Sequence, residues 1–384
     1  MPTFKFPAGF LWGSATASYQ VEGGIENNDW AQAAREGKVP ASGRATDHYN
    51  LYEKDFDLAK SLGHNALRFS IEWARVEPEE GKFSEEAIEH YRKVLEALRA
   101  RGLEPFVTLW HFTLPTWFSK KGGFENKKAP FYFERYAKYV VSRLGESAKF
   151  WITMNEPMIY SGEGYWHKHW PPFKKNIFRF INVVNNLAMS HNVTYQQIKK
   201  FGLSLQVGIV HNMKSYEFNH NPITRLVSMI AIFFSNHWFL SKINSTFDFI
   251  GVNYYFHRGF NEKILHEITD MGWEIYPKGI YHVLKELKKY HKPVYITENG
   301  LADAKDEKRA KFIKDHLYWA HRAMQEGVDL RGYLHWSLLD NFEWAHGFGS
   351  RFGLIEVDYQ TLERSIRPSA WEYAKICKEN QLEI

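Results

Sequence analysis

The sequence predicts a single (β/α)8 barrel, a TIM barrel, that occupies residues 1–384. One unit recurs along the chain: an amphipathic helix, a glycine or proline at its end, and a short apolar strand. Eight such strands alternate with helices and no Ser/Gly/Pro-rich linker divides them, which favours a closed parallel barrel over an open sheet. No GxGxxG or GxxxxGK[ST] motif follows any strand, so the usual nucleotide-binding fingerprints are missing.

The elements follow one another in a regular order. The first strand is expected at Phe10–Ser14, and a helix that stops at Gly63 precedes the second strand, Ala66–Ser70. The next helix begins after Ser84, an N-cap residue type that is followed by two glutamates in the first turn. Its apolar side chains recur at helical spacing on one face. The remaining strands are expected at 105–110, 150–155, 206–211, 247–253, 293–298 and 331–337.

The longest apolar region, residues 226–240, reads LVSMIAIFFSNHWFL. Polar residues interrupt it and it is shorter than a bilayer span, so no transmembrane segment is expected. We expect a mostly buried helix here. A weak membrane contact is the alternative that the sequence leaves open.

Composition narrows the class of protein. The net charge of +5 is spread over short basic groups, so a nucleic-acid partner is not expected. Cys377 is the only cysteine, which excludes an intramolecular disulfide and suits a reducing compartment. No secretion signal is visible at the start of the sequence, and we expect a cytoplasmic location. The sequence indicates no oligomeric state.

Polar and aromatic side chains follow six of the eight predicted strands, where a barrel of this kind builds its active site. They are Arg68, His111, Asn155, Glu156, Asn253, Tyr254, Tyr255, Glu298 and Trp336. A single glutamate at a strand end is often a loop ion pair or a helix cap. Two glutamates, each after an apolar strand and from different parts of the barrel, favour a catalytic role instead.

Two facing carboxyl groups suit the hydrolysis of a glycosidic bond. One protonates the leaving oxygen, and the other attacks the anomeric carbon or activates water. Arg68 and the hydroxyl of Tyr255 are expected to hold Glu298 ionised. The negative charge of Glu298 would then raise the pKa of Glu156 and keep it protonated.

Eight segments together resemble the family 1 β-glycosidases. They are FLWGSATASYQVEG, LRFSIEWARVEP, TLWHFTLPTWF, TMNEP, DFIGVNYY, YITENG, HWSLLDNFEW and RFGLIEVDY, in the family's order. The resemblance implies a (β/α)8 barrel, a retaining mechanism, and no metal or organic cofactor.

The resemblance also implies roles for individual residues. Glu156 matches the family's acid/base and Glu298 its nucleophile, while Asn155 matches the asparagine that binds the 2-hydroxyl of the sugar. Tyr255 and Arg68 match the groups that orient the nucleophile. The sugar-binding set that the match implies consists of Gln20, His111, Asn155, Asn253, Trp336, Glu343 and Trp344.

Within the family, small changes redirect function. Glu156 stands where thioglucosidases have glutamine, so the resemblance implies cleavage of O-glycosides. Glu343 would repel a 6-phosphate, which favours unphosphorylated sugars. The chain is short for the family, since only SKINST (241–246) separates the helix containing NHWFL from the strand DFIGVNYY. We therefore expect an aglycone site open to bulky or apolar leaving groups.

The expected function is that of an exo-acting β-glycosidase that hydrolyses a terminal glucoside, galactoside or related sugar. Two alternatives stay open at this point: a transglycosidase that uses the same intermediate, and a non-catalytic carbohydrate-binding barrel. Gln20 and Glu343 suit more than one sugar epimer, so the sequence does not select one.

Overall fold

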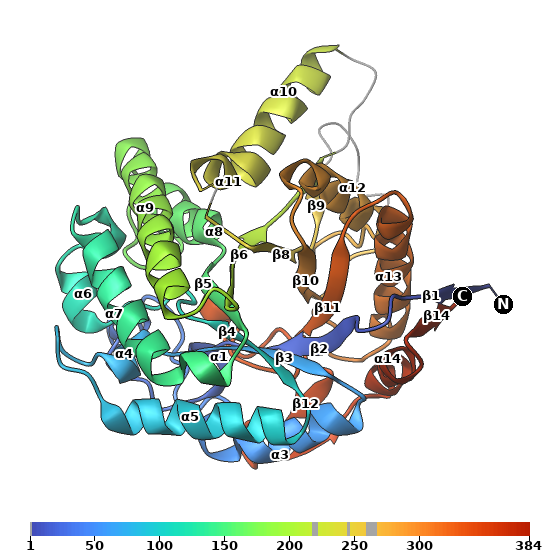
Figure 1. Ribbon diagram of the computed structural model, residues 1–384, viewed down its shortest axis with the longest axis horizontal. Helices are drawn as coiled ribbons and strands as arrows, with labels where there is room; N and C mark the ends of the chain where they lie inside the picture. The colour runs from blue at the N-terminus through green and yellow to red at the C-terminus, as the bar shows by residue number, and fades with distance from the viewer. Residues whose placement is uncertain (1, 217–221, 244–245, 259–266) are drawn as a thin grey trace.

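Eight parallel strands form a closed barrel, and helices surround it in the computed structural model of the protein (Figure 1). The structure describes residues 2–216, 222–243, 246–258 and 267–384. The barrel strands follow the order β10, β11, β2, β3, β4, β5, β6 and β8, so neighbours in the barrel are also neighbours along the chain. This topology confirms the predicted (β/α)8 barrel.

The barrel strands begin and end within two residues of their predicted positions. They are β2 (Leu11–Ala15), β3 (Ala66–Ser70), β4 (Glu104–Thr108), β5 (Phe150–Asn155), β6 (Gln206–Asn212), β8 (Phe249–Asn253), β10 (Val294–Asn299) and β11 (Leu330–Trp336).

Helices of very different lengths connect the strands. The long ones are α3 (His48–Ser61), α5 (Glu85–Ala100), α7 (Ala129–Leu144), α9 (Ile177–Phe201), α10 (Pro222–Ile232), α12 (Lys278–Leu287), α13 (Arg309–Gln325) and α14 (Pro368–Glu379). The short ones are α1 (Ser18–Val21), α2 (Asp29–Arg35), α4 (Trp73–Val76), α6 (Thr116–Lys120), α8 (Pro157–Gly162) and α11 (Trp238–Lys242).

Three small sheets lie outside the barrel. Two are antiparallel: β1 (Thr3–Lys5) with β14 (Gln381–Glu383), and β12 (Ile355–Val357) with β13 (Arg364–Ile366). In the third, β7 (Ser215–Tyr216) pairs in parallel with β9 (His257–Arg258).

The predicted start of α5 is confirmed. The side chain of Ser84 accepts a hydrogen bond from the backbone N–H of Ala87 at 3.1 Å, which satisfies one of the free donors of the first turn. Ile88, Tyr91 and Leu95 lie on the buried face of the helix. The spacing of the apolar residues therefore both forms the helix and fixes which side covers the barrel.

Aromatic rings fill much of the inside of the barrel. Phe106 and Phe150 stack with their centroids 4.3 Å apart, and Phe249 meets Tyr295 edge to face. Gly208 makes room for this packing, since a Cβ there would lie 2.4 Å from the ring of Phe249. These residues come earlier in their strands than the candidate site residues, so the rings close the barrel beneath the site.

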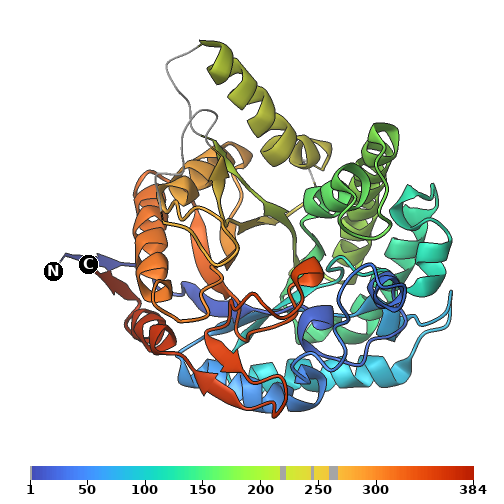
Figure 2. The same ribbon diagram turned by 180° about the vertical axis from the view of Figure 1, so that it is seen from behind.

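The apolar region 226–240 is not the mostly buried helix that the sequence predicts. Its second half is packed, and Phe239 and Leu240 are fully buried. In α10, however, Ser228 is the only buried residue. Seen from either side, α10 stands away from the barrel (Figures 1 and 2).

The helical stretch Pro222–Lys242 is long and apolar enough to cross a membrane, judged by length and composition among the described residues. Only 28% of its most apolar window is buried inside the molecule. The prediction failed because hydrophobicity shows only that burial of a segment would be favourable. Burial also requires another element of the fold to pack against that segment.

Candidate active site

The two candidate carboxyl groups lie at the same end of the barrel. Glu156 directly follows β5, and Glu298 is the last residue but one of β10. Both side chains are buried, and Asn253 at the end of β8 lies between them in the barrel order. The closed barrel therefore brings together side chains that are more than a hundred residues apart in the sequence.

Glu298 is held by a cation and a hydroxyl group. Arg68 donates to its Oε1 at 2.5 Å, and the Tyr255 hydroxyl donates to its Oε2 at 2.5 Å. Burial raises the pKa of Glu298, while Arg68 and Tyr255 both act to lower it. The charge of Arg68 thus offsets much of the cost of keeping a carboxylate in a dry site.

Glu156 lies in an uncharged cradle. Asn253 and Asn212 both donate to its Oε1, at 2.7 Å and 3.0 Å. Burial, followed by the nearby charge of Glu298, raises the pKa of Glu156 to about 7. Because both amides bind Oε1, the other carboxyl oxygen is the one left to carry a proton.

The amide orientations in this cradle are fixed by neighbouring groups. Thr297 donates its hydroxyl to Oδ1 of Asn253 at 2.8 Å, so the NH₂ group of Asn253 faces Glu156. Arg68 likewise donates to Oδ1 of Asn155 at 2.7 Å, which turns the NH₂ group of Asn155 toward Nε2 of His111.

His111 is therefore a neutral donor. Its Nε2 accepts from Asn155 at 3.2 Å, which places the ring proton on Nδ1. Burial, together with the charge of Arg68, holds the pKa of His111 well below its usual range. Among the described residues nothing accepts a hydrogen bond from Nδ1, although the atom is buried.

Gln20 supplies the complementary acceptor. Its NH₂ group donates to Oδ1 of Asn341 at 2.8 Å and to the carbonyl of Phe342 at 2.9 Å. Its Oε1 is buried, and no donor from the described part of the chain reaches it. A buried acceptor and a buried donor without partners are costly alone, so this end of the barrel is built for a polar ligand.

Flat aromatic surfaces border these polar atoms. The ring of His111 lies nearly parallel to the indoles of Trp336 and Trp344, with centroids 6.2 Å and 6.1 Å away. The indole N–H of Trp336 donates to Glu343 at 3.1 Å. Burial raises the pKa of Glu343 to about 8, which favours its neutral form at pH 7.

A further carboxyl group, Glu72, connects two parts of the site from below. It accepts hydrogen bonds from Ser18, two residues before Gln20, and from Thr113, two residues after His111, each at 3.0 Å. Burial raises the pKa of Glu72 to about 7. One buried side chain thus holds the two backbone segments that carry the unpartnered acceptor and donor.

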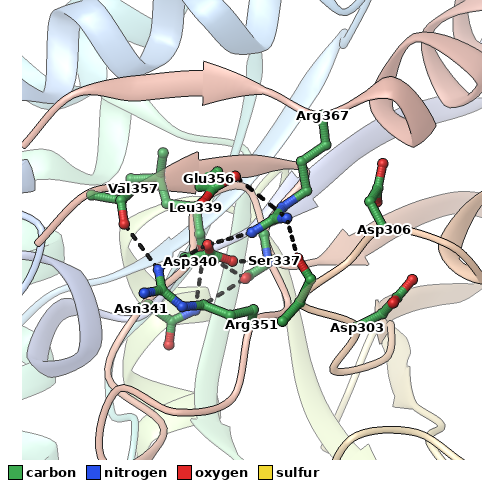
Figure 3. Close-up of polar contacts among 12 residues, drawn as sticks. Asp303, Asp306, Ser337, Leu339, Asp340, Asn341, Arg351, Glu356, Val357 and Arg367 are labelled. Carbon is green, nitrogen blue, oxygen red and sulfur yellow. Dashed lines mark hydrogen bonds and ion pairs between the residues drawn. The ribbon is translucent and has the colours of Figure 1, made fainter.

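The loop from Ser337 to Leu354 is held by a buried ionic cluster (Figure 3). Asp340 accepts from Arg351 at 3.1 Å and from Arg367 at 2.7 Å, and its other oxygen accepts from the backbone N–H of Gly353. Asp340 is fully buried. Because this loop carries Glu343 and Trp344, the cluster fixes one wall of the site.

The structure brings the sequence-predicted site residues to this end of the barrel, except Tyr254, whose hydroxyl donates to the carbonyl of Tyr276 and whose ring lies beside His316 of α13. The residues at this end are Gln20, Arg68, His111, Asn155, Glu156, Asn253, Tyr255, Glu298, Trp336, Glu343 and Trp344. Two contributors were missed. Asn212 ends β6 one residue beyond the predicted strand, so a search of strand ends would have found it. Glu72 binds Ser18 and Thr113, which lie beneath the site, and its position in the sequence does not indicate this role.

A parallel eight-stranded barrel with two buried carboxyl groups and unpartnered polar atoms at the carboxyl ends of its strands defines a glycoside hydrolase. The chain belongs to glycosyl hydrolase family 1, whose model matches residues 3–246 and 257–382. The enzyme is of the β-glucosidase/β-galactosidase type, as its relatives show.

Beta-glucosidase A of Thermotoga maritima is 34% identical, with 99% of each chain covered. That alignment runs over 442 positions, so parts of the relative have no counterpart in the 384 residues here. A 6-phospho-beta-galactosidase of Clostridium acetobutylicum is 29% identical over 98% of each chain.

Solved structures agree with this assignment. The beta-glycosidase from Pyrococcus horikoshii is 41% identical and superposes with a TM-score of 0.94, covering 100% of this chain and 97% of the other. The family 1 β-glucosidase from Thermotoga maritima gives a TM-score of 0.95 at 32% identity, with both chains fully covered.

Proposed function

We propose that the enzyme is a retaining exo-β-glycosidase that removes a terminal, unphosphorylated sugar from a β-D-glucoside, galactoside or related glycoside. Glu298 attacks the anomeric carbon while Glu156 protonates the leaving oxygen. Glu156 then takes a proton from a water molecule whose oxygen attacks the anomeric carbon, so that the bond to Glu298 breaks and the sugar is released. Residues 1–384 act as one catalytic domain in this proposal.

The unequal surroundings of the two carboxyl groups carry the proposal. Glu298 contacts the cation of Arg68, whereas the side-chain donors to Glu156 from the described residues are the amides of Asn212 and Asn253. When both groups compete for one negative charge, the group beside the cation keeps it. Glu298 is therefore the nucleophile, and Glu156 retains the proton that a leaving group needs.

The surrounding side chains suit a sugar ring. Oε1 of Gln20 would accept from a hydroxyl, and Nδ1–H of His111 would donate to one. The indole face of Trp336 suits the apolar C–H face of the ring. These groups support recognition of the terminal sugar, but they do not choose between epimers.

An unphosphorylated sugar is favoured for a reason that differs from the sequence argument. The pKa of Glu343 is about 8, so repulsion of a phosphate by this group is weak at pH 7. Arg351, the basic residue of the segment 340–353, binds Asp340 and the carbonyl of Val357 instead of facing a ligand. A phosphate would thus gain no partner from this arginine.

The leaving-group side is proposed to accept bulky or apolar aglycones, since the segment 241–246 is short. Residues 244–245 lie outside the described part of the chain. Relative kcat/KM values for octyl and methyl β-glucosides test this, and a clear preference for methyl would contradict it.

The nucleophile is tested with a Glu298→Ala variant assayed on an aryl β-glucoside. We expect almost no turnover, and added azide should restore release of the phenol with formation of the α-glycosyl azide, because the small anion enters where the carboxylate stood. Glu307→Ala, an exposed glutamate, is the matched control. Substantial turnover by Glu298→Ala without azide would remove this residue from the proposed role.

The stereochemistry is tested with the unmodified enzyme. Proton NMR of the first product should show the β-anomer, whereas an initial α-anomer would rule out retention. Adding a dilute alcohol separates hydrolysis from transfer: free sugar should dominate, and an alkyl glycoside as the main product would identify a transglycosidase.

A further inference from the structure

Helix α10 exposes apolar side chains over one broad face, opposite the buried Ser228. Ile223 is 73% exposed, Leu226 58% and Met229 56%, and Val227 and Ile230 are also exposed. An apolar helix face is normally packed against another element, because its surface gains free energy by leaving water. This one stands clear of the barrel in both views (Figures 1 and 2), so the described part of the chain leaves its apolar face exposed.

The apolar surface continues onto neighbouring elements. Phe234 meets Trp238 with ring centroids 5.8 Å apart, and Trp238 meets Phe180 of α9 at 6.0 Å. Phe180 in turn meets Trp166 at 6.1 Å. A continuous row of rings therefore joins α10 to the start of α9, where Phe178 is 79% exposed. Exposed apolar surface of this extent marks an interaction site.

The charge of this part of the chain is strongly one-sided. Residues 164–247 contain nine lysines and arginines and one acidic residue, although the whole chain has a net charge of only +5. Lys168, Lys175 and Arg225 are exposed beside the apolar surface. Lys174 and Arg179 both pair with Glu125, so that acid offsets part of the charge.

We propose that α10, together with the first turn of α9, docks the enzyme on an anionic membrane surface. Apolar side chains flanked by lysine and arginine are what such a surface binds: the side chains enter the acyl boundary and the cations meet acidic headgroups. A second copy of this chain is the poorer partner, because a two-fold interface would bring the same positive segments together.

The helix lies on the membrane and does not cross it. The stretch after α10 is fixed to the barrel: Asn236 donates to Glu286 at 3.0 Å, and Phe239 and Leu240 are fully buried. Within the stretch Pro222–Lys242, α10 is therefore the part that can enter a lipid layer, and at eleven residues it is too short to span one.

Flotation of the purified enzyme with lipid vesicles tests the proposal. We expect binding to vesicles of phosphatidylcholine with phosphatidylglycerol, and binding at least about fivefold weaker to phosphatidylcholine alone or in high salt. A Leu226→Gln/Met229→Gln/Ile230→Gln variant should bind at least about tenfold more weakly. Its turnover of a soluble aryl glycoside should be unchanged, since none of these residues lies at the site.

The matched control is Phe131→Gln/Trp371→Gln, which removes exposed apolar side chains of α7 and α14. This variant should bind vesicles like the unmodified enzyme. Equal binding by the α10 variant and the unmodified enzyme would overturn the proposal. So would a dimer in light scattering that the α10 substitutions dissociate, because a second copy would then cover the helix.

Discussion

Replacing Asn212 tests whether Glu156, the proposed acid/base, is tuned by its two amide neighbours. The amide of Asn212 donates to Oε1 of Glu156, and so stabilises the ionised form and lowers the pKa of that carboxyl group. Asn212→Leu keeps a similar shape and removes the donor. The pKa of Glu156 should therefore rise above its value of about 7.

The size of the shift follows from the contact. A hydrogen bond to a charged group contributes about 1.5–3 kcal/mol. Asn253 still donates to the same oxygen in the variant, and water can take part of the vacated place, so we expect the lower end of this range. Since one pKa unit corresponds to about 1.4 kcal/mol, the shift should be about one unit upward.

The alkaline limb of kcat/KM against pH reports the pKa of the group that must be protonated in the free enzyme. With an aryl β-glucoside, this limb should move about one unit to higher pH in Asn212→Leu. Asn182→Leu, which removes an amide that donates to the carbonyl of Glu125, should leave it in place. A limb that stays put or moves to lower pH in Asn212→Leu would refute the reasoning.

Three further substitutions have defined outcomes. Arg68→Gln removes the cation that lowers the pKa of Glu298, so the acid limb of kcat/KM should move to higher pH and kcat should fall; an unchanged acid limb contradicts this. Arg364→Met removes the arginine partner of buried Asp55 and leaves it the contact with His48, and urea unfolding should show a loss of about 3–5 kcal/mol, whereas a loss below about 1 kcal/mol would show the arginine pair to be unimportant. Glu72→Gln should lower kcat/KM about fivefold to thirtyfold with the circular dichroism spectrum retained, because the hydroxyls that it binds lose about 1–2 kcal/mol; unchanged kinetics argue against a positioning role.

The strands and most of the site could be predicted because one geometric rule governs both. In a closed parallel barrel, every strand delivers its carboxyl end to the same rim, so Glu156 and Glu298 had to converge once both were assigned to strand ends. The hydrogen bonds from Arg68 to Asn155 and from Asn155 to His111 could not be predicted. They depend on side-chain rotamers and on the orientation of the amide, which the spacing of residues in the sequence does not determine.

The outward position of α10 could not be predicted for a different reason. The sequence of α10 is strongly apolar, and apolar residues of this kind are usually buried. Whether another element covers them depends on the path of the chain around β6 and β8, which hydropathy does not contain. Retention of configuration and the roles of the individual site residues stay predictions, as does a cytoplasmic location.

The ion pair between Arg367 and Asp340 has a consequence for the order in which parts of the site can form during translation. Arg367 is translated well after Glu298 and after the whole loop that Asp340 anchors. A nascent chain therefore contains Glu156 and Glu298 before the wall that bears Trp344 is fixed. That wall is fixed only after every residue that borders the site has been translated.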